Sequence, residues 1–235
     1  MLKNDENVKQ GGWADPPVMK RGVIRQRGSY ELQNSNSRMK FAPNGRPLNP
    51  VGRTGMQNRG LLGKWGANFT ADPIVTRYNY DKEGFPLEVV IIKRGDTGAW
   101  AIPGGMVDPG ECVSMTLRRE FDEEAVNVTT EEEKETCRKI LEELFVSENA
   151  QELYVGYVDD PRNTDNAWLE TKAVNFHCTK EQAEFLQLKS GDDAVAVQWT
   201  EVNKENPIFE GFYANHKDFI FSVLKFRPQH DRQKG

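Results

Sequence analysis

The sequence contains few cysteines, and none of them is spaced for metal binding. Its 235 residues include three cysteines, Cys112, Cys137 and Cys178. An odd number of cysteines without a CxxC spacing predicts neither a disulfide framework nor a zinc site. The pattern indicates reduced thiols, as in an intracellular protein.

Long apolar stretches are absent as well. No segment approaches the ~20 consecutive apolar residues that a membrane-spanning helix needs. The N-terminal segment carries Asp5 and Glu6 and has no apolar run, so it resembles neither a signal peptide nor a transit peptide. We therefore expect no membrane segment in this chain and a cytoplasmic rather than a mitochondrial location. The chain is either a soluble protein or a soluble piece of a longer one.

An excess of positive charge is also missing. The chain has 31 Lys and Arg against 36 Asp and Glu, a formal net charge of −5. This balance argues against nonspecific binding to nucleic acid phosphates, so we expect no nucleic acid partner. Hydrophobic residues make up only 37% of the chain and the mean hydropathy is −0.71, which predicts a loop-rich part. The length predicts one domain, or one domain with a smaller lobe.

Residues 1–60 are polar and rich in Gly, Pro, Asn and Arg. Within them Arg46, Arg53 and Arg59 alternate with glycines, a composition typical of loops. Two interpretations remain open at this point: a basic, loop-rich lobe or a solvated linker.

Downstream of this segment, hydrophobic patterns predict strands that alternate with helices. The predicted strands cover residues 72–78, 87–93, 100–102, 151–158, 167–178 and 194–200. The predicted helices cover about 112–125, 130–145 and 217–226. Thr129 or Thr130 can cap the second helix, whose first turn is acidic. Strands before, between and after helices favour a mixed sheet with helices on both faces.

A glycine loop at Gly104 and Gly105 leads into the first predicted helix. That helix carries Glu120, Glu123 and Glu124 at positions i, i+3 and i+4, within about 100° of arc. Like charges four residues apart destabilise a helix by roughly 0.2–0.5 kcal/mol, so a bound cation would explain the arrangement. Carboxylates without Cys or His suit a hard ion, Mg²⁺ or alternatively Mn²⁺. The competing interpretation is a solvated acidic helix face.

The spacing of this segment resembles the Nudix box, Gly-x5-Glu-x7-Arg-Glu-U-x-Glu-Glu-x-Gly-U, in which U is apolar. The matching residues are Gly105, Glu111, Arg119, Glu120, Phe121, Glu123 and Glu124. Val126 and Asn127 depart from the pattern, both beyond the carboxylates. The resemblance implies an α/β fold, the Nudix α/β/α sandwich with a mixed sheet. It also implies Mg²⁺ bound by the three helical glutamates, with Arg119 holding Glu123 four residues away.

Four further blocks, at residues 52–55, 59–66, 100–111 and 159–168, resemble a narrower group. They are similar to the mitochondrial-type ADP-ribose pyrophosphatases and to the C-terminal Nudix-homology domain of melastatin-type, ADP-ribose-gated TRP cation channels. We accordingly expect a loop-rich N-terminal extension over residues 1–70 and a catalytic domain over residues 71–235. The run at 213–217 is similar to the channel domain, whereas 119–121 is similar to the competent enzyme.

The resemblance implies Mg²⁺-dependent hydrolysis of ADP-ribose to AMP and ribose 5-phosphate. The alternative is an ADP-ribose sensor that is part of a larger channel protein, with slow or incidental hydrolysis. A Nudix enzyme acting on RNA caps or oxidised nucleotides finds no support in the acidic balance or in the 159–168 loop.

Substrate-binding and catalytic roles follow from the same resemblance. Glu120 is the first candidate for the general base, with an acid on a flexible loop as the alternative. Glu111 is expected to steady the junction of loop and helix. The predicted substrate-binding residues are Asp72, Gly104, Gly105, Met106, Asp160, Arg162, Tyr213, Asn215 and His216. By composition alone, the 159–168 loop also fits an ordinary turn rich in Asp and Asn.

Overall fold

The computed structural model describes Asp15 and residues 40–108, 113–126, 130–186, 188–190 and 194–226. These residues belong to two compact units. The first comprises Met1–Thr70, Met106–Cys112 and Val155–Lys172, and the second comprises Ala71–Gly105, Val113–Tyr154 and Ala173–Gly235. Within the described ranges, no helix has the length and apolar content that crossing a bilayer requires. The predicted domain boundary after residue 70 stays a prediction.

The strands form one seven-stranded sheet. They are β1 (Gly66–Tyr78), β2 (Leu87–Arg94), β3 (Trp100–Ala101), β4 (Gly105–Met106), β5 (Gln151–Tyr157), β6 (Ala167–His177) and β7 (Ala194–Glu201). The main order is β3-β2-β1-β6-β5, with β4 paired to β1 and β7 paired to β2.

The sheet is mixed, as the sequence predicts. β2 is antiparallel to β1, β3 and β7, and Val90 lies opposite Trp199 in the last of these pairs. β1 and β6 run in the same direction, because their bonded residues rise together in number. Gly66 donates its N–H to the carbonyl of Asn166, and Cys178 donates to the carbonyl of Thr76.

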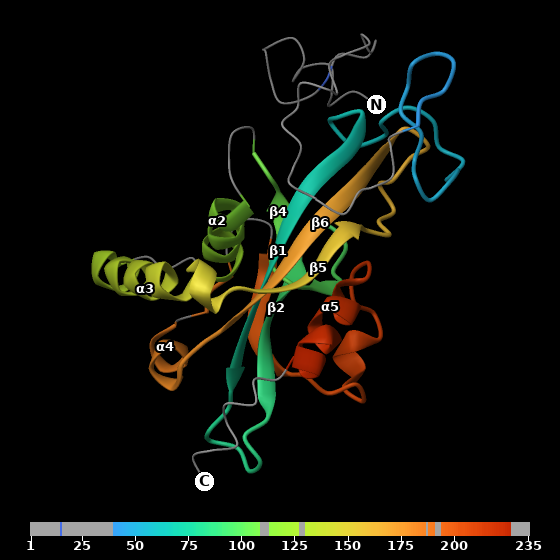
Figure 1. The fold of residues 1–235 in the computed structure, drawn as a ribbon. Coiled ribbons are helices and arrows are strands. Elements are labelled where there is room, and N and C mark those ends of the chain that lie inside the picture. Colours follow the sequence, from blue (N-terminus) through green and yellow to red (C-terminus); the bar gives the residue numbers. More distant parts are fainter. Residues whose placement is uncertain are drawn as a thin grey trace. The chain divides into compact units, whose positions relative to one another are not determined.

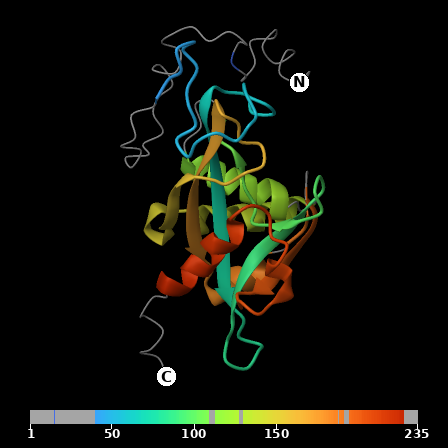
Figure 2. The ribbon, with the colours of Figure 1, turned by 90° about the vertical axis from the view of Figure 1, so that its right-hand side faces the viewer.

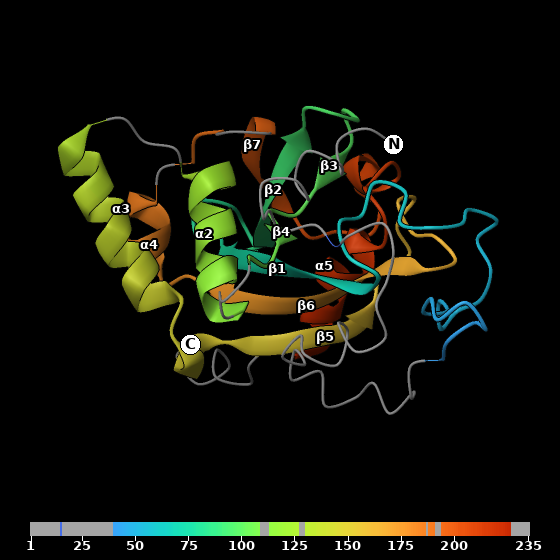
Figure 3. The same cartoon turned by 90° about the horizontal axis from the view of Figure 1, so that it is seen from above.

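The helices belong to the second unit. They are α2 (Val113–Ala125), α3 (Glu131–Leu144), α4 (Lys180–Phe185) and α5 (His216–Val223), with short 3-10 turns η2 (Ser147–Asn149), η3 (Pro207–Phe209) and η4 (Leu224–Phe226). α2, α3 and α4 lie on one side of the sheet and α5 lies on the other, as the two views in Figure 1 and Figure 3 show. This arrangement confirms the predicted α/β/α sandwich.

An apolar core joins α5 to the sheet. Phe219 and Ile220 of α5 pack with Val89 and Ile91 of β2, and all four are buried. Burying one such side chain stabilises the fold by about 1.5–3 kcal/mol, so this layer fixes the start of α5 against the sheet.

The opposite face is covered by α2 through its apolar stripe. Leu117, Phe121 and Ala125 are buried, as predicted, while the side chain of Val113 lies outside the described part. The Phe121 ring lies 5.7 Å from that of Phe145, which in turn lies 4.5 Å from Phe176 of β6. Burial of this stripe determines which flank of α2 carries the acidic residues.

Helix α3 begins where its local sequence predicts. Thr130 is the N-cap, and its Oγ1 accepts the N–H of Glu133 at 3.2 Å. The Glu133 carboxylate accepts the Thr130 N–H at 3.2 Å, which completes a capping box. The helix ends at Leu144, one residue before the predicted end.

Three features of the strands and helices differ from the sequence prediction. β1 begins at Gly66, earlier than predicted, and the two-residue β4 was not predicted. Nor was α4, although Thr179 and Gln182 form a capping box at its start. Both short elements lack the length over which hydrophobic periodicity can be recognised. Figure 2 shows the turn between β1 and β2 extending below α5.

Residues 40–65 form a lobe of loops with no helix or strand, drawn in blue in Figure 1. Arg59 is buried there, where it donates from Nη1 to the carbonyl of Gly63 and lies 5.4 Å from the Trp65 ring. The backbone N–H of Trp65 donates to the carboxylate of Asp15 at 2.9 Å. These contacts are those of packed loops over residues 40–65, while the choice between lobe and linker for residues 1–60 stays a prediction.

Candidate functional site

The glycine loop and helix α2 meet at Gly105 and Glu120. Glu120 is buried, and a Cβ atom built on Gly105 would overlap both of its carboxylate oxygens. Only glycine therefore permits this approach of loop backbone and carboxylate. Two residues of the predicted site, separated by the start of a helix, are thus in direct contact.

Arg119 pairs with two of the helical carboxylates. Its Nη2 lies 2.9 Å from the Glu120 carboxylate and its Nη1 lies 2.9 Å from that of Glu123. The predicted Arg119–Glu123 pair is therefore confirmed, and the guanidinium also offsets the repulsion between the two acids. The side chain of Glu124 and all of Glu111 lie outside the described part, so their predicted roles stay predictions.

Gly104 has a similarly close neighbour. A Cβ atom at this position would overlap Oδ1 of Asp72 and would lie 3.0 Å from the carbonyl oxygen of Ala71. Asp72 is buried on β1. The loop therefore places its two glycines against two different carboxylates, those of Asp72 and Glu120.

The start of α5 is joined to the segment after β3. The Ile102 N–H donates to Nδ1 of His216 at 3.3 Å, which makes Nδ1 an acceptor and places the proton of the neutral ring on Nε2. The Tyr213 N–H donates to the Trp100 carbonyl at 2.8 Å. These bonds place His216 and Tyr213 beside the residues that lead into the glycine loop.

Asn215 carries an unusual acceptor. Its Oδ1 is buried and has no hydrogen-bond partner within the described part of the chain. Ala214 beside it has φ of 46°, a conformation that is uncommon for a residue other than glycine. Buried polar atoms are nearly always paired, so this oxygen is a candidate acceptor for a ligand hydroxyl or amine.

In the first unit, Asp160 holds Arg162. The guanidinium donates from Nε to Oδ1 at 2.8 Å and from Nη2 to Oδ2 at 2.9 Å. The Arg162 N–H adds a third bond to the same carboxylate, at 2.8 Å. Bidentate pairing of this kind fixes the orientation of the guanidinium.

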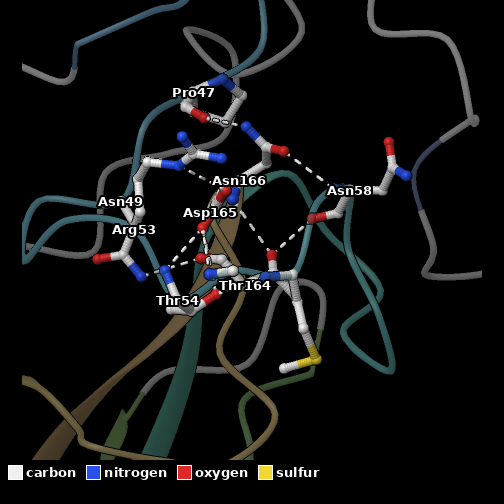
Figure 4. Close-up of polar contacts among 10 residues, drawn as sticks. Pro47, Asn49, Arg53, Thr54, Asn58, Thr164, Asp165 and Asn166 are labelled. Atoms are coloured by element: carbon white, nitrogen blue, oxygen red, sulfur yellow. Dashed lines mark hydrogen bonds and ion pairs between the residues drawn. The ribbon is translucent and has the colours of Figure 1, made fainter.

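The following loop residues have a role that sequence reasoning missed, shown in Figure 4. The Thr54 and Gly55 N–H groups donate to Oδ1 of Asp165 at 2.7 and 3.1 Å. The Asn166 amide donates to the Pro47 carbonyl and accepts the Asn58 N–H, both at 2.9 Å. Asp165 and Asn166 therefore fasten residues 47–58 to the β5–β6 loop. The composition of the loop gave no signal for this role, since its partners lie more than 100 residues away.

The pKa of Asp165 reflects these bonds. Burial acts to raise it, but the Thr54 and Gly55 N–H donors, the Thr54 hydroxyl and the charge of Arg53 together lower the pKa below its ordinary value. The carboxylate is therefore held in its charged form.

The residues of the predicted metal site have the right chemistry for a hard divalent cation. Glu120 and Glu123 supply carboxylate oxygens from adjacent turns of α2. Among the described side chains, no three or more His, Cys, Asp or Glu gather as a ligand set. The predicted set includes Glu124, whose side chain is outside that part, so the site stays a prediction.

Two family models match the chain. The NUDIX domain model matches residues 72–221, and the model described as NUDT9-like, N-terminal domain matches residues 4–66.

The chain is also similar to named relatives. It is 44% identical to the mitochondrial ADP-ribose pyrophosphatase of Rattus norvegicus, with 93% of this chain and 65% of that protein aligned. It is 47% identical to a predicted nudix hydrolase of Caenorhabditis elegans, over 96% of this chain and 83% of the relative. It is 50% identical to the transient receptor potential cation channel subfamily M member-like 2 of Nematostella vectensis, over 78% of this chain and 12% of the channel.

The chain thus spans slightly less than two thirds of the rat protein and a small part of the channel. The match of the NUDIX domain model covers more than half of the chain and contains the glycine loop, α2 and the start of α5. The chain therefore belongs to the Nudix family.

Proposed function

We propose that this protein hydrolyses ADP-ribose to AMP and ribose 5-phosphate with a divalent cation, Mg²⁺ or alternatively Mn²⁺. The observation that carries the proposal is the contact between Gly105 and the buried Glu120 carboxylate, with Arg119 joining Glu120 to Glu123. It brings a glycine loop suited to phosphate groups against carboxylates suited to a hard cation. The name of the rat relative supports ADP-ribose as the substrate.

Glu120, Glu123 and Glu124 are the residues that would hold the cation. A bound divalent cation would supply charge neutralisation at the phosphoryl oxygens and acidify a water molecule. Glu120 would accept the proton of the attacking water, and Arg119 would keep the carboxylates in position. Gly104 and Gly105 would let the backbone of the loop, which continues into Met106, approach the diphosphate.

The predicted substrate-binding residues have the chemistry that such a substrate requires. Arg162, oriented by Asp160, offers donors to a phosphate or a ribose hydroxyl. The unpartnered Asn215 oxygen offers an acceptor, and His216, whose Nδ1 accepts the Ile102 N–H, is a further predicted contact. Asp72 and Tyr213 are the remaining residues that would contact the substrate, as the resemblance to ADP-ribose pyrophosphatases implies.

The test is release of AMP from ADP-ribose by the purified chain, with and without Mg²⁺. The Glu120→Gln variant should lose activity by about a hundredfold or more, since it removes both a ligand and the base, while its unfolding transition changes little. Glu148→Gln is the matched control, because Glu148 is exposed in η2. No AMP from the wild-type protein under any divalent cation would refute the proposal.

A second candidate function is that of an ADP-ribose sensor within a larger channel protein. The 50% identity to the Nematostella vectensis channel, together with residues 213–217, favours it. Calorimetry in Mg²⁺ separates the two: binding of ADP-ribose without turnover indicates a sensor, whereas turnover indicates an enzyme. For either function we propose a cytoplasmic location of the chain. The alternative is a mitochondrial location, as in the name of the rat relative.

A further inference from the structure

The first unit contains a pocket of about 580 Å³ that none of the residues proposed for hydrolysis lines. Its wall is formed by segments 40–57 and 165–170, including Lys40, Asn49, Arg53, Trp168 and Glu170. The volume lies within the about 300–1,000 Å³ that is typical of small-molecule sites.

The wall of the pocket is held in place by side-chain bonds to backbone. The Asn49 amide donates to the Thr164 carbonyl at 2.9 Å and accepts the Val51 N–H at 3.0 Å. Asp165 accepts the N–H groups of Thr54 and Gly55, so the segment after Pro50 is also fastened (Figure 4). A pocket with such a wall is formed before its ligand arrives, which lowers the entropy lost on binding.

The charges at the pocket favour an anion. Lys40, Arg46 and Arg53 line it together with two carboxylates, Asp165 and Glu170. No ion-pair partner is recorded for Lys40 or Arg46 within the described residues, and only Arg53 pairs, loosely, with Asp165 at 3.5 Å.

Arg46 is also oriented. Its guanidinium carbon lies 5.1 Å from the centre of the Trp65 ring, a cation–π contact that leaves the N–H groups at the guanidinium edge available. A planar group held in this way suits bidentate contact with a phosphate.

Both carboxylates of the pocket already have donors. Asp165 accepts the bonds from Thr54 and Gly55, and Glu170 accepts the Trp168 indole N–H at 2.8 Å. Burial also raises the pKa of Glu170. This favours the neutral carboxyl group and so reduces its electrostatic repulsion of a bound anion. The positive groups are thus the ones that remain available to a ligand.

We propose that this pocket is a second ligand site, which binds a phosphorylated small molecule of about mononucleotide size through Lys40 and Arg46. The guanidinium and the ammonium contact the phosphate, and the remainder of the molecule lies against the apolar part of the wall, which includes Ala42, Leu48 and Trp168. The site is independent of hydrolysis, since it uses none of the proposed catalytic residues.

The experiment is an NMR titration of the full chain with AMP in the presence of EDTA. The indole N–H signal of Trp168, assigned with Trp168→Phe, reports on the pocket directly because that N–H donates to Glu170. AMP should shift this signal and the amide signals of residues 49–57 along one saturable curve. Adenosine, which lacks the phosphate, should leave them unshifted.

The variant that tests the cations is Lys40→Ala/Arg46→Ala. It should weaken the apparent affinity for AMP, read from these signals, by about tenfold or more, because it removes both cations that would contact the phosphate. Lys134→Ala/Lys139→Ala is the matched control, because it removes two exposed cations from α3. Arg46→Gln, with a shorter but polar side chain, provides a second variant should the double variant lose its dispersed spectrum.

Three results would overturn the inference. They are no shift at Trp168 with millimolar AMP, an equal shift with adenosine, and an unchanged curve in the pocket variants. Loss of AMP release in an activity assay bears on the hydrolytic proposal alone, so failure of one proposal can be told from failure of the other.

Discussion

Replacing Gly105 by Ala tests the contact on which the proposed active site depends. The added Cβ would overlap the Glu120 carboxylate, which is buried and paired to Arg119 at 2.9 Å. The carboxylate has to move, or the loop has to move away from α2. Overpacking of this kind destabilises a fold by typically about 1–3 kcal/mol. For a chain of this size, about 1 kcal/mol lowers Tm by about 2–4 °C, so Tm should fall by roughly 2–12 °C.

The effect on activity should exceed the effect on stability. Displacing a catalytic group by about 1 Å costs about a hundredfold in rate, so kcat/KM for ADP-ribose should fall by that factor or more. Unfolding monitored by circular dichroism and AMP release measured on the same preparation provide the two quantities.

Gly211→Ala is the matched control, because a Cβ atom there meets nothing within 4 Å and the backbone is not in the left-handed region. It should change the free energy of unfolding by less than about 0.5 kcal/mol and leave kcat/KM unchanged. Wild-type activity in Gly105→Ala would refute the argument that the approach of loop and carboxylate forms the active site.

Three further predictions concern other polar groups. Asn215→Leu removes an unpartnered buried oxygen, so stability should be kept or rise by about 1 kcal/mol while KM for ADP-ribose rises; an unchanged KM would contradict a binding role. Asp165→Ala should destabilise the lobe by about 2 kcal/mol and speed hydrogen exchange at residues 54–55, read by mass spectrometry; unchanged exchange there would argue against the fastening. Glu88→Ala should cost about 3 kcal/mol in urea unfolding, because the buried carboxylate has three partners, against under about 1 kcal/mol for the exposed Asp96→Ala. Equal losses of stability in the Glu88→Ala and Asp96→Ala variants would contradict this comparison. Burial acts to raise the pKa of Glu88, but its hydrogen-bond donors lower it overall. The stabilisation by Glu88 is therefore present above the unfolded-state pKa and is lost as the pH falls through the folded-state pKa.

Local sequence signals were sufficient for much of the fold. The Thr130 cap with its acidic first turn predicted the start of α3, and the β-branched run of β2 predicted a buried strand. Both signals act between near neighbours, through capping bonds and through burial along one element. The same holds for the apolar stripe of α2 and for the Arg119–Glu123 pair, one turn apart.

Short elements gave weaker signals. α4 has six residues and β4 has two, lengths over which periodicity does not separate a helix or strand from a loop. The Thr179-x-x-Gln182 capping box was the one available signal for α4, and such a motif is informative only with a helix pattern behind it.

The 159–168 loop shows where reasoning from sequence reaches its limit. Its polar composition fitted both a ligand-binding loop and an ordinary turn. In the structure the two parts of the loop have different roles. Asp160 orients Arg162, whereas Asp165 and Asn166 form hydrogen bonds that hold residues 47–58 in place. The donors and acceptors of the second group belong to residues more than 100 positions apart, and no local rule relates them.

The spacing of the acidic residues on α2, read from the chain alone, established the Nudix resemblance and the kind of ion its carboxylates suit. It did so because a helix of 3.6 residues per turn places positions i, i+3 and i+4 on one flank wherever the helix lies. The approach of Gly105 to Glu120, the orphaned oxygen of Asn215 and the pocket beside Arg46 became visible only in three dimensions. Each arises from the packing of segments distant in sequence, and the geometry of such packing depends on the whole core and not on any one pattern.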